Sequence, residues 1–120
     1  MIETKLGVIE SRFADLIWEN EPLATSQLIK MCEAEFSWKR TTTYTVLKRL
    51  SDRGLFKNSN GEVTALISRD EFNALQSENF VQENFGGSLP AFLTAFTSKN
   101  NLSKKDVEQI KKMIKAFEEK

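Results

Sequence analysis

The sequence predicts a mainly α-helical (α+β) protein in which three helices are followed by a short β-hairpin and then by a second group of helices. Three observations predict this order. Apolar residues recur every three or four positions up to Leu50, Asn60-Gly61 separates two short runs with β-strand character, and helical spacing returns from Arg69 onward. A chain of 120 residues suffices for one compact domain, or for a small domain with an appended helical segment.

Composition argues against several classes of protein. Cys32 is the single cysteine, histidine is absent and the acidic residues show no metal-ligand spacing, so we expect no disulfide, metal or other cofactor and interpret Cys32 as a buried apolar residue. No apolar run approaches about 18 residues and the N-terminus lacks a signal-peptide pattern, so we expect a cytoplasmic protein without membrane insertion. Without histidine, an activated nucleophile or a phosphate-binding glycine loop, an enzyme is not expected.

The first two helices are predicted over residues 9–19 and 26–35. Pro22 separates them, because proline lacks a backbone N–H and disfavours helix in the preceding residue. We expect Thr25 or Ser26 to cap the second helix. The residues expected to face the core are Ile9, Phe13, Leu16, Ile17, Leu28, Ile29 and Cys32, with Phe36 and Trp38 filling the core in the connection that follows.

The third helix, residues 39–53, carries two different faces. Val46, Leu47 and Leu50 form an apolar face that packs, while Thr41 is expected to cap the helix and Gly54 to end it in a left-handed conformation. The other face is hydroxylic and basic. We expect it to bind DNA, because hydroxyl and cationic groups suit phosphate oxygens and base edges, and its residues are Lys39, Arg40, Thr41, Thr42, Tyr44, Thr45, Lys48 and Arg49.

Charge is distributed unevenly although the chain is neutral overall. Residues 1–36 have three basic and seven acidic side chains, whereas residues 37–57 have six basic side chains and only Asp52 as an acid. A polyanion responds to the local field within about 10 Å, so the second segment is the one that would attract nucleic acid. An ordinary amphipathic helix with a solvated charged face remains the structural alternative, and Arg49 could face DNA or pair with an acid of the first two helices.

Residues 1–68 therefore show the plan of a winged helix-turn-helix domain with a short β-hairpin wing. Asn60-Gly61 favours a tight hairpin because both residues tolerate positive φ. A hairpin directly after a basic third helix is typical of domains in which that helix enters the major groove and the wing rests on the DNA backbone.

Residues 69–120 are predicted to form C-terminal dimerisation helices over 70–84, 89–97 and 103 onward. These helices carry more aromatic surface than about fifty residues can bury alone, and the last has apolar residues at heptad-like steps. The alternative is that they fold back on the first domain as an intramolecular support. The residues expected at the dimer interface are Phe72, Leu75, Phe92, Phe96, Val107, Ile110, Ile114 and Phe117.

Four stretches resemble the penicillinase and methicillin-resistance repressors, the BlaI/MecI/CopY-type winged-helix regulators. The most specific parts are the tryptophan of the first stretch and the T-x-x-L-x-R-L core of the second. The resemblance covers nearly the whole chain. The stretches are FADLIW at residues 13–18, TTTYTVLKRL at 41–50 with RGL at 53–55, FGG at 85–87 with the segment 89–96, and the closing helix 103–117.

This resemblance implies a cytoplasmic homodimer that binds a palindromic operator and represses transcription in a β-lactam-response system. It also implies release by a sensor-linked protease, and the family's phenylalanine places the scissile bond between Ala95 and Phe96, although alanine stands here where familiar members have asparagine. The copper-responsive branch has a C-terminal cysteine cluster that is missing after Cys32. Ala65 and Leu66 replace an aromatic residue frequent in the wing, which leaves wing contacts open.

A winged-helix module that binds other proteins and not DNA is the alternative function. Such a surface would more often mix its charges or expose apolar residues than carry six basic residues against one acid over residues 37–57.

Overall fold

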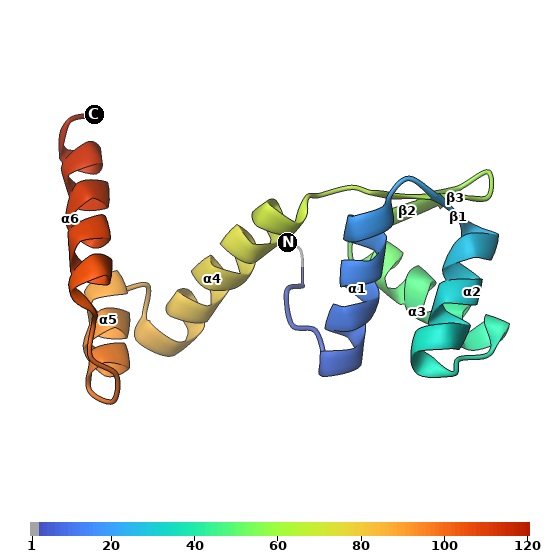
Figure 1. Ribbon diagram of the computed structural model, residues 1–120, viewed down its shortest axis with the longest axis horizontal. Helices are drawn as coiled ribbons and strands as arrows, with labels where there is room; N and C mark the ends of the chain where they lie inside the picture. The colour runs from blue at the N-terminus through green and yellow to red at the C-terminus, as the bar shows by residue number, and fades with distance from the viewer. Residues whose placement is uncertain (1–2) are drawn as a thin grey trace. The chain divides into compact units, whose positions relative to one another are not determined.

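The computed structural model describes residues 3–120 and divides into two compact units, Met1–Asn79 and Phe80–Lys120 (Figure 1). The predicted mainly α architecture is confirmed. The elements are α1 (Val8–Asn20), β1 (Leu23–Ala24), α2 (Thr25–Phe36), α3 (Arg40–Asp52), β2 (Phe56–Ser59), β3 (Glu62–Ala65), α4 (Arg69–Phe85), α5 (Leu89–Thr97) and α6 (Lys104–Glu118).

The core of the first unit is formed where α1, α2 and α3 pack together with the small sheet. Phe13 and Ile17 of α1 and Leu28 of α2 are fully buried, as predicted. Ile9 is 43% exposed, so its assignment to the core was wrong: the buried face of α1 turns toward Ala14 instead. The two other predicted core positions of these helices, Leu16 and Ile29, are half-buried.

Cys32 lies fully buried in this core, as the sequence interpretation required. Burial raises the pKa of the Cys32 thiol to about 11, which keeps the sulfur protonated and neutral at physiological pH. Phe36 and Trp38 pack against the same core, with ring centroids 4.7 Å apart, and Trp38 also lies 5.6 Å from Phe13.

Two predicted helix caps are wrong. Neither Thr25 nor Ser26 caps α2: the N-cap is Ala24, and the buried Thr25 hydroxyl donates instead to Oδ1 of Asn58, 2.9 Å away. Thr41 lies inside the first turn of α3, and the N-cap is Lys39. In both cases the helix begins before the predicted cap, α2 at Thr25 and α3 at Arg40, so the hydroxyl residues fall within the helix.

The end of α3 and the hairpin follow the sequence prediction. Gly54 has φ +88°, and the N–H of buried Leu55 donates to the Leu50 carbonyl at 3.1 Å. Asn60 and Gly61 both have positive φ and join β2 to β3.

The sheet contains one more strand than predicted. The two-residue strand β1 pairs antiparallel with β3, which gives the order β1-β3-β2. A two-residue run has no alternating pattern from which a strand could be predicted.

The start of α4 belongs to the first unit. Phe72 is 3% exposed within its core, and its ring centroid lies 5.5 Å from that of Trp18. The prediction that Phe72 lies at a dimer interface is therefore wrong, because its side chain is buried within its own chain. The sequence placed the domain boundary between residues 68 and 69, whereas the compact units divide after Asn79.

The second unit has no fully buried residue. Four phenylalanine rings contact one another with centroids 5.7–6.2 Å apart, but every residue from 80 to 120 is half-buried or exposed. Its helices are locally well formed, since the hydroxyls of Ser88 and Ser103 cap α5 and α6. Gly86 and Gly87 both have positive φ and break the chain between α4 and α5.

Candidate nucleic-acid interface

The helix α3 presents the predicted hydroxyl and basic side chains to solvent. Its inner face consists of Val46, Leu47 and Leu50 together with Thr43, all of them buried. The structure brings the predicted residues together on the opposite face and at the start of the helix. Those exposed residues are Lys39, Arg40, Thr41, Thr42, Tyr44, Thr45, Lys48 and Arg49.

The N-terminal end of α3 is electropositive. Lys39 is the N-cap, Arg40 is the first helical residue, and the first turn contains no acidic residue and no side-chain cap among the residues described. Cations at this end oppose the helix dipole and add nothing to helix stability. The arrangement instead leaves the unpaired N–H groups of the first turn next to two exposed cations, a combination suited to phosphate. The Arg40 guanidinium lies 5.6 Å from the ring centroid of Tyr44, which orders both side chains.

The hydroxyls of α3 are not equivalent. The Thr45 hydroxyl donates to the Thr41 carbonyl at 2.9 Å, so it is left as an acceptor, with its methyl group free for apolar contact. Phosphate oxygens only accept hydrogen bonds. Thr41 and Thr42, at the helix start, are therefore better placed than Thr45 to contact a phosphate.

Lys48 makes a weak, exposed ion pair with Asp52. Lys48 Nζ lies 3.0 Å from Asp52 Oδ2, and the side chains are 77% and 67% exposed. A lysine four residues before an acid is the less favourable order on a helix, and the acid lies at the negative end of the helix dipole. This pair is readily exchanged for a stronger anion.

Arg49 is held by α1. Its Nη1 lies 3.0 Å from Oε2 of Glu10, whose other oxygen accepts from the Gly7 N–H at 3.1 Å. The Gly7 N–H, above all, and the Arg49 guanidinium lower the pKa of Glu10 below its ordinary value. Of the two roles that the sequence left open for Arg49, the structure shows the pairing with an acid, which ties α3 to α1.

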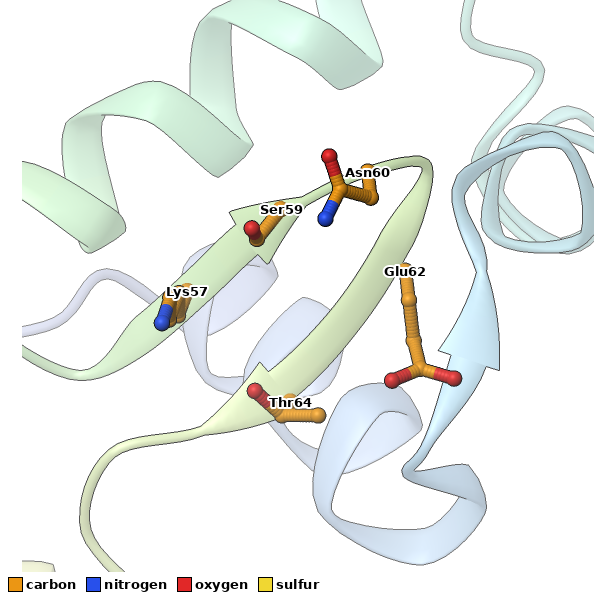
Figure 2. Close-up of a pocket in the computed structure, with 5 residues that line it drawn as sticks. All are labelled: Lys57, Ser59, Asn60, Glu62 and Thr64. Carbon is orange, nitrogen blue, oxygen red and sulfur yellow. The ribbon is translucent and has the colours of Figure 1, made fainter.

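The wing supplies a second polar surface that the sequence analysis did not assign. Lys57 lies opposite Thr64 and Ser59 opposite Glu62 in the hairpin register, so these four side chains share one face. Figure 2 shows these four side chains together with Asn60, and the five residues line a pocket on the hairpin. The sequence did contain a signal for this surface, namely the alternation of polar and apolar residues along the two strands. The opposite face of the hairpin consists of the buried Phe56 and Val63 with their partners.

A groove lies between α3 and β2. It is lined by Tyr44, Leu47, Lys48 and Ser51 of α3 and by Asn58 of β2.

A sequence model of the penicillinase repressor family matches residues 6–116 of the chain. The chain belongs to the penicillinase repressor family. This family assignment supports a role as a transcriptional repressor, in agreement with the resemblance that the sequence showed. A comparison with curated proteins gave no match.

Two further properties of this repressor concern the residues that the structure describes. None of their helices is both long and apolar enough to cross a bilayer. No group of three or more histidine, cysteine, aspartate or glutamate side chains among them is arranged to hold a metal ion.

Proposed function

We propose that the repressor acts in the cytoplasm as a homodimer that binds a palindromic operator through α3 of each copy. The observation that carries the proposal is the division of α3 into one fully apolar or buried face and one face of cations and hydroxyls. Among the described residues of α3, Tyr44 is the single exposed large hydrophobic side chain, which favours DNA over a protein partner.

Each group has a specific place in the proposed complex. Lys39 and Arg40 contact phosphates together with the N–H groups of the first helical turn, and the Thr41 and Thr42 hydroxyls donate to the same strand. Tyr44, Thr45 and Lys48 face base edges or the far backbone, where Lys48 reaches a phosphate or guanine. Arg49 holds α3 against α1 through Glu10 and acts as a positioning residue. On the wing, Lys57, Ser59 and Thr64 contact the DNA backbone beside the groove that α3 enters.

Replacing Asp52 with asparagine should tighten operator binding by about threefold to tenfold, because the change frees Lys48 and removes a negative charge near phosphate. The stability cost is small, since an exposed pair at this spacing contributes about 0.3–0.5 kcal/mol. Fluorescence anisotropy with labelled operator measures the effect. Glu78→Gln, at an exposed position of α4, is the control and should change little. Unchanged or weaker operator binding by Asp52→Asn would contradict the proposal that Lys48 contacts DNA.

Dimerisation is proposed through residues of the second unit. Leu89, Phe96, Met113, Ile114 and Phe117 are between 45% and 67% exposed in the single chain. Forty-one residues without a buried side chain cannot compensate the entropy of folding alone, and a second copy offers the same apolar surface in complementary form. The other residues proposed for the interface are half-buried in the single chain: Phe92, Val107 and Ile110 of the same unit, and Leu75 of the first unit.

Relief of repression is proposed to follow cleavage between Ala95 and Phe96. Both residues are exposed on α5, a helix of nine residues, and cutting there would separate α6 from α4. The support is the family relationship and the exposure of Ala95. Mass spectrometry of the protein recovered from β-lactam-treated host cells should show a fragment ending at Ala95; intact protein in fully induced cells would exclude this route.

Footprinting on DNA from the region upstream of the protein's own gene tests the proposed function. Two protected half-sites related by a dyad and about one helical turn, 34 Å, apart are expected, because each copy carries one α3. Protection of a single half-site, or none at any protein concentration, would contradict binding as a dimer.

A further inference from the structure

Asn58 of β2 is a polar residue on the inner face of the hairpin. It stands opposite the buried Val63 in the hairpin register and therefore shares the face of Val63 and Phe56. Unlike these two neighbours, Asn58 is exposed, and it lines the groove between α3 and β2. The hairpin thus presents an amide to this groove, on the face opposite to that of Lys57 and Ser59.

The orientation of the Asn58 amide is set by α2. The Thr25 hydroxyl donates to Asn58 Oδ1 at 2.9 Å, and Thr25 is only 5% exposed. The backbone of Thr25 is held in turn, since its N–H donates to the Gly61 carbonyl at 2.9 Å. The amide oxygen of Asn58 is therefore bonded to a buried, well-anchored residue. Its Nδ2 makes no hydrogen bond among the described residues.

An amide in this state suits a phosphate better than a base. An asparagine that reads adenine uses its oxygen as acceptor and its nitrogen as donor at the same time. Because Oδ1 of Asn58 is engaged by Thr25, the side chain offers DNA its two N–H donors, and phosphate oxygens only accept. Lys48 lines the same groove, so a cation lies beside the neutral donor.

We infer that Asn58 donates through Nδ2 to a phosphate of the DNA backbone in the groove between α3 and β2, and that Thr25 is its positioning residue. The inference rests on the proposed binding of DNA, and the residues that carry it all belong to the first unit. Because the amide is neutral and contacts no base, it strengthens binding to any sequence and leaves the salt dependence unchanged.

Two substitutions of Asn58 test the contact. Asn58→Ala should weaken operator binding by at least about tenfold, because a dimer loses two hydrogen bonds to charged oxygens. Asn58→Asp keeps an oxygen that accepts from Thr25 but replaces the donor by a carboxylate oxygen, so it should weaken binding by about 100-fold with the wing intact. Anisotropy with the full chain and the footprinted operator measures affinity, and thermal unfolding measures stability.

Asn73→Ala and Asn73→Asp are the matched controls. They make the same changes at an exposed position of α4, outside α3 and the wing, and should leave operator affinity within about twofold of wild type.

The kind of DNA group is tested with a second duplex of the same length and unrelated sequence. Asn58→Ala should weaken binding to both duplexes by the same factor, and the slope of log affinity against log salt should keep its wild-type value. Lys48→Ala, in contrast, should make this slope less steep. Ethylation of one phosphate in each half-site should weaken wild type and leave Asn58→Ala unaffected.

The positioning role of Thr25 is tested in two backgrounds. Thr25→Val keeps the shape of the side chain but removes the hydroxyl, so the Asn58 amide can rotate and operator binding should weaken by about threefold to fivefold. The same substitution should have no effect in the Asn58→Ala protein, where there is no amide left to orient. Thr25→Ser retains the hydroxyl and should bind like wild type.

Three results would overturn the inference. Operator binding by Asn58→Ala that equals wild type would exclude the contact, and a loss confined to the operator would show that the amide reads a base. An equal loss from Thr25→Val in both backgrounds would show that Thr25 only stabilises the domain. In each of these cases wild type still binds operator, whereas wild type that binds neither duplex would overturn the proposed function and the inference with it.

Discussion

The Arg40→Ala/Lys48→Ala variant should bind operator at least about 100-fold more weakly than wild type, because a dimer loses four cations that face phosphate. The fold should persist. Both side chains are exposed, Arg40 opposes the helix dipole, and the Lys48–Asp52 pair contributes about 0.5 kcal/mol or less. Anisotropy with operator DNA measures the affinity, and thermal unfolding followed by circular dichroism measures the stability.

A matched control distinguishes loss of contact from loss of charge. Arg12→Ala/Lys112→Ala removes one arginine of α1 and one lysine of α6, and should leave operator affinity within about threefold of wild type because neither lies on α3. Equal losses in the two double variants would mean that total charge, and not α3, governs binding. Loss of the folded state in the first variant would contradict the exposed placement of its residues.

Ile114→Asp should dissociate the dimer and lower operator affinity by about 100-fold or more. Ile114 is 53% exposed in the single chain, so the substitution costs the isolated chain little, whereas it places an unpaired carboxylate in the proposed interface. A monomer then binds one half-site and loses the gain from joining two, which is typically between about 10² and 10⁴. Sedimentation velocity reports the oligomeric state in parallel with the affinity.

The control for this variant is Gln109→Asp, which adds the same charge to α6 at an exposed position off the line formed by Val107, Ile110, Ile114 and Phe117. It should remain dimeric. An Ile114→Asp protein that still sediments as a dimer would remove α6 from the interface and require a different apolar surface.

The parts of this fold that sequence could predict are those fixed by neighbouring residues. The apolar positions of α3, its end at Gly54 and the turn at Asn60-Gly61 depend on spacing and backbone preference within a few residues. The same helical periodicity predicted which residues of α3 are exposed, because residues between the buried positions lie on the opposite face of the helix.

The parts that could not be predicted depend on distant partners. Glu10 is 39 positions from Arg49, and Thr4 is 75 positions from Asn79, so neither contact leaves a local pattern. No local pattern distinguishes Phe72 from the other aromatic residues of the C-terminal region. Its contact with Trp18 places it in the first unit. The wing surface is an exception, because the alternation of Lys57 and Ser59 along β2 is a local pattern that the sequence already contains.

The salt dependence of operator binding is the measurement that tests the central claim most directly. Four cations in each copy, Lys39, Arg40, Lys48 and Lys57, predict about eight neutralised phosphates and a slope of log Kobs against log salt near −7. The slope should fall to about half in Arg40→Ala/Lys48→Ala. A wild-type affinity that stays constant between about 50 and 200 mM salt would contradict recognition of DNA by the cationic face of α3.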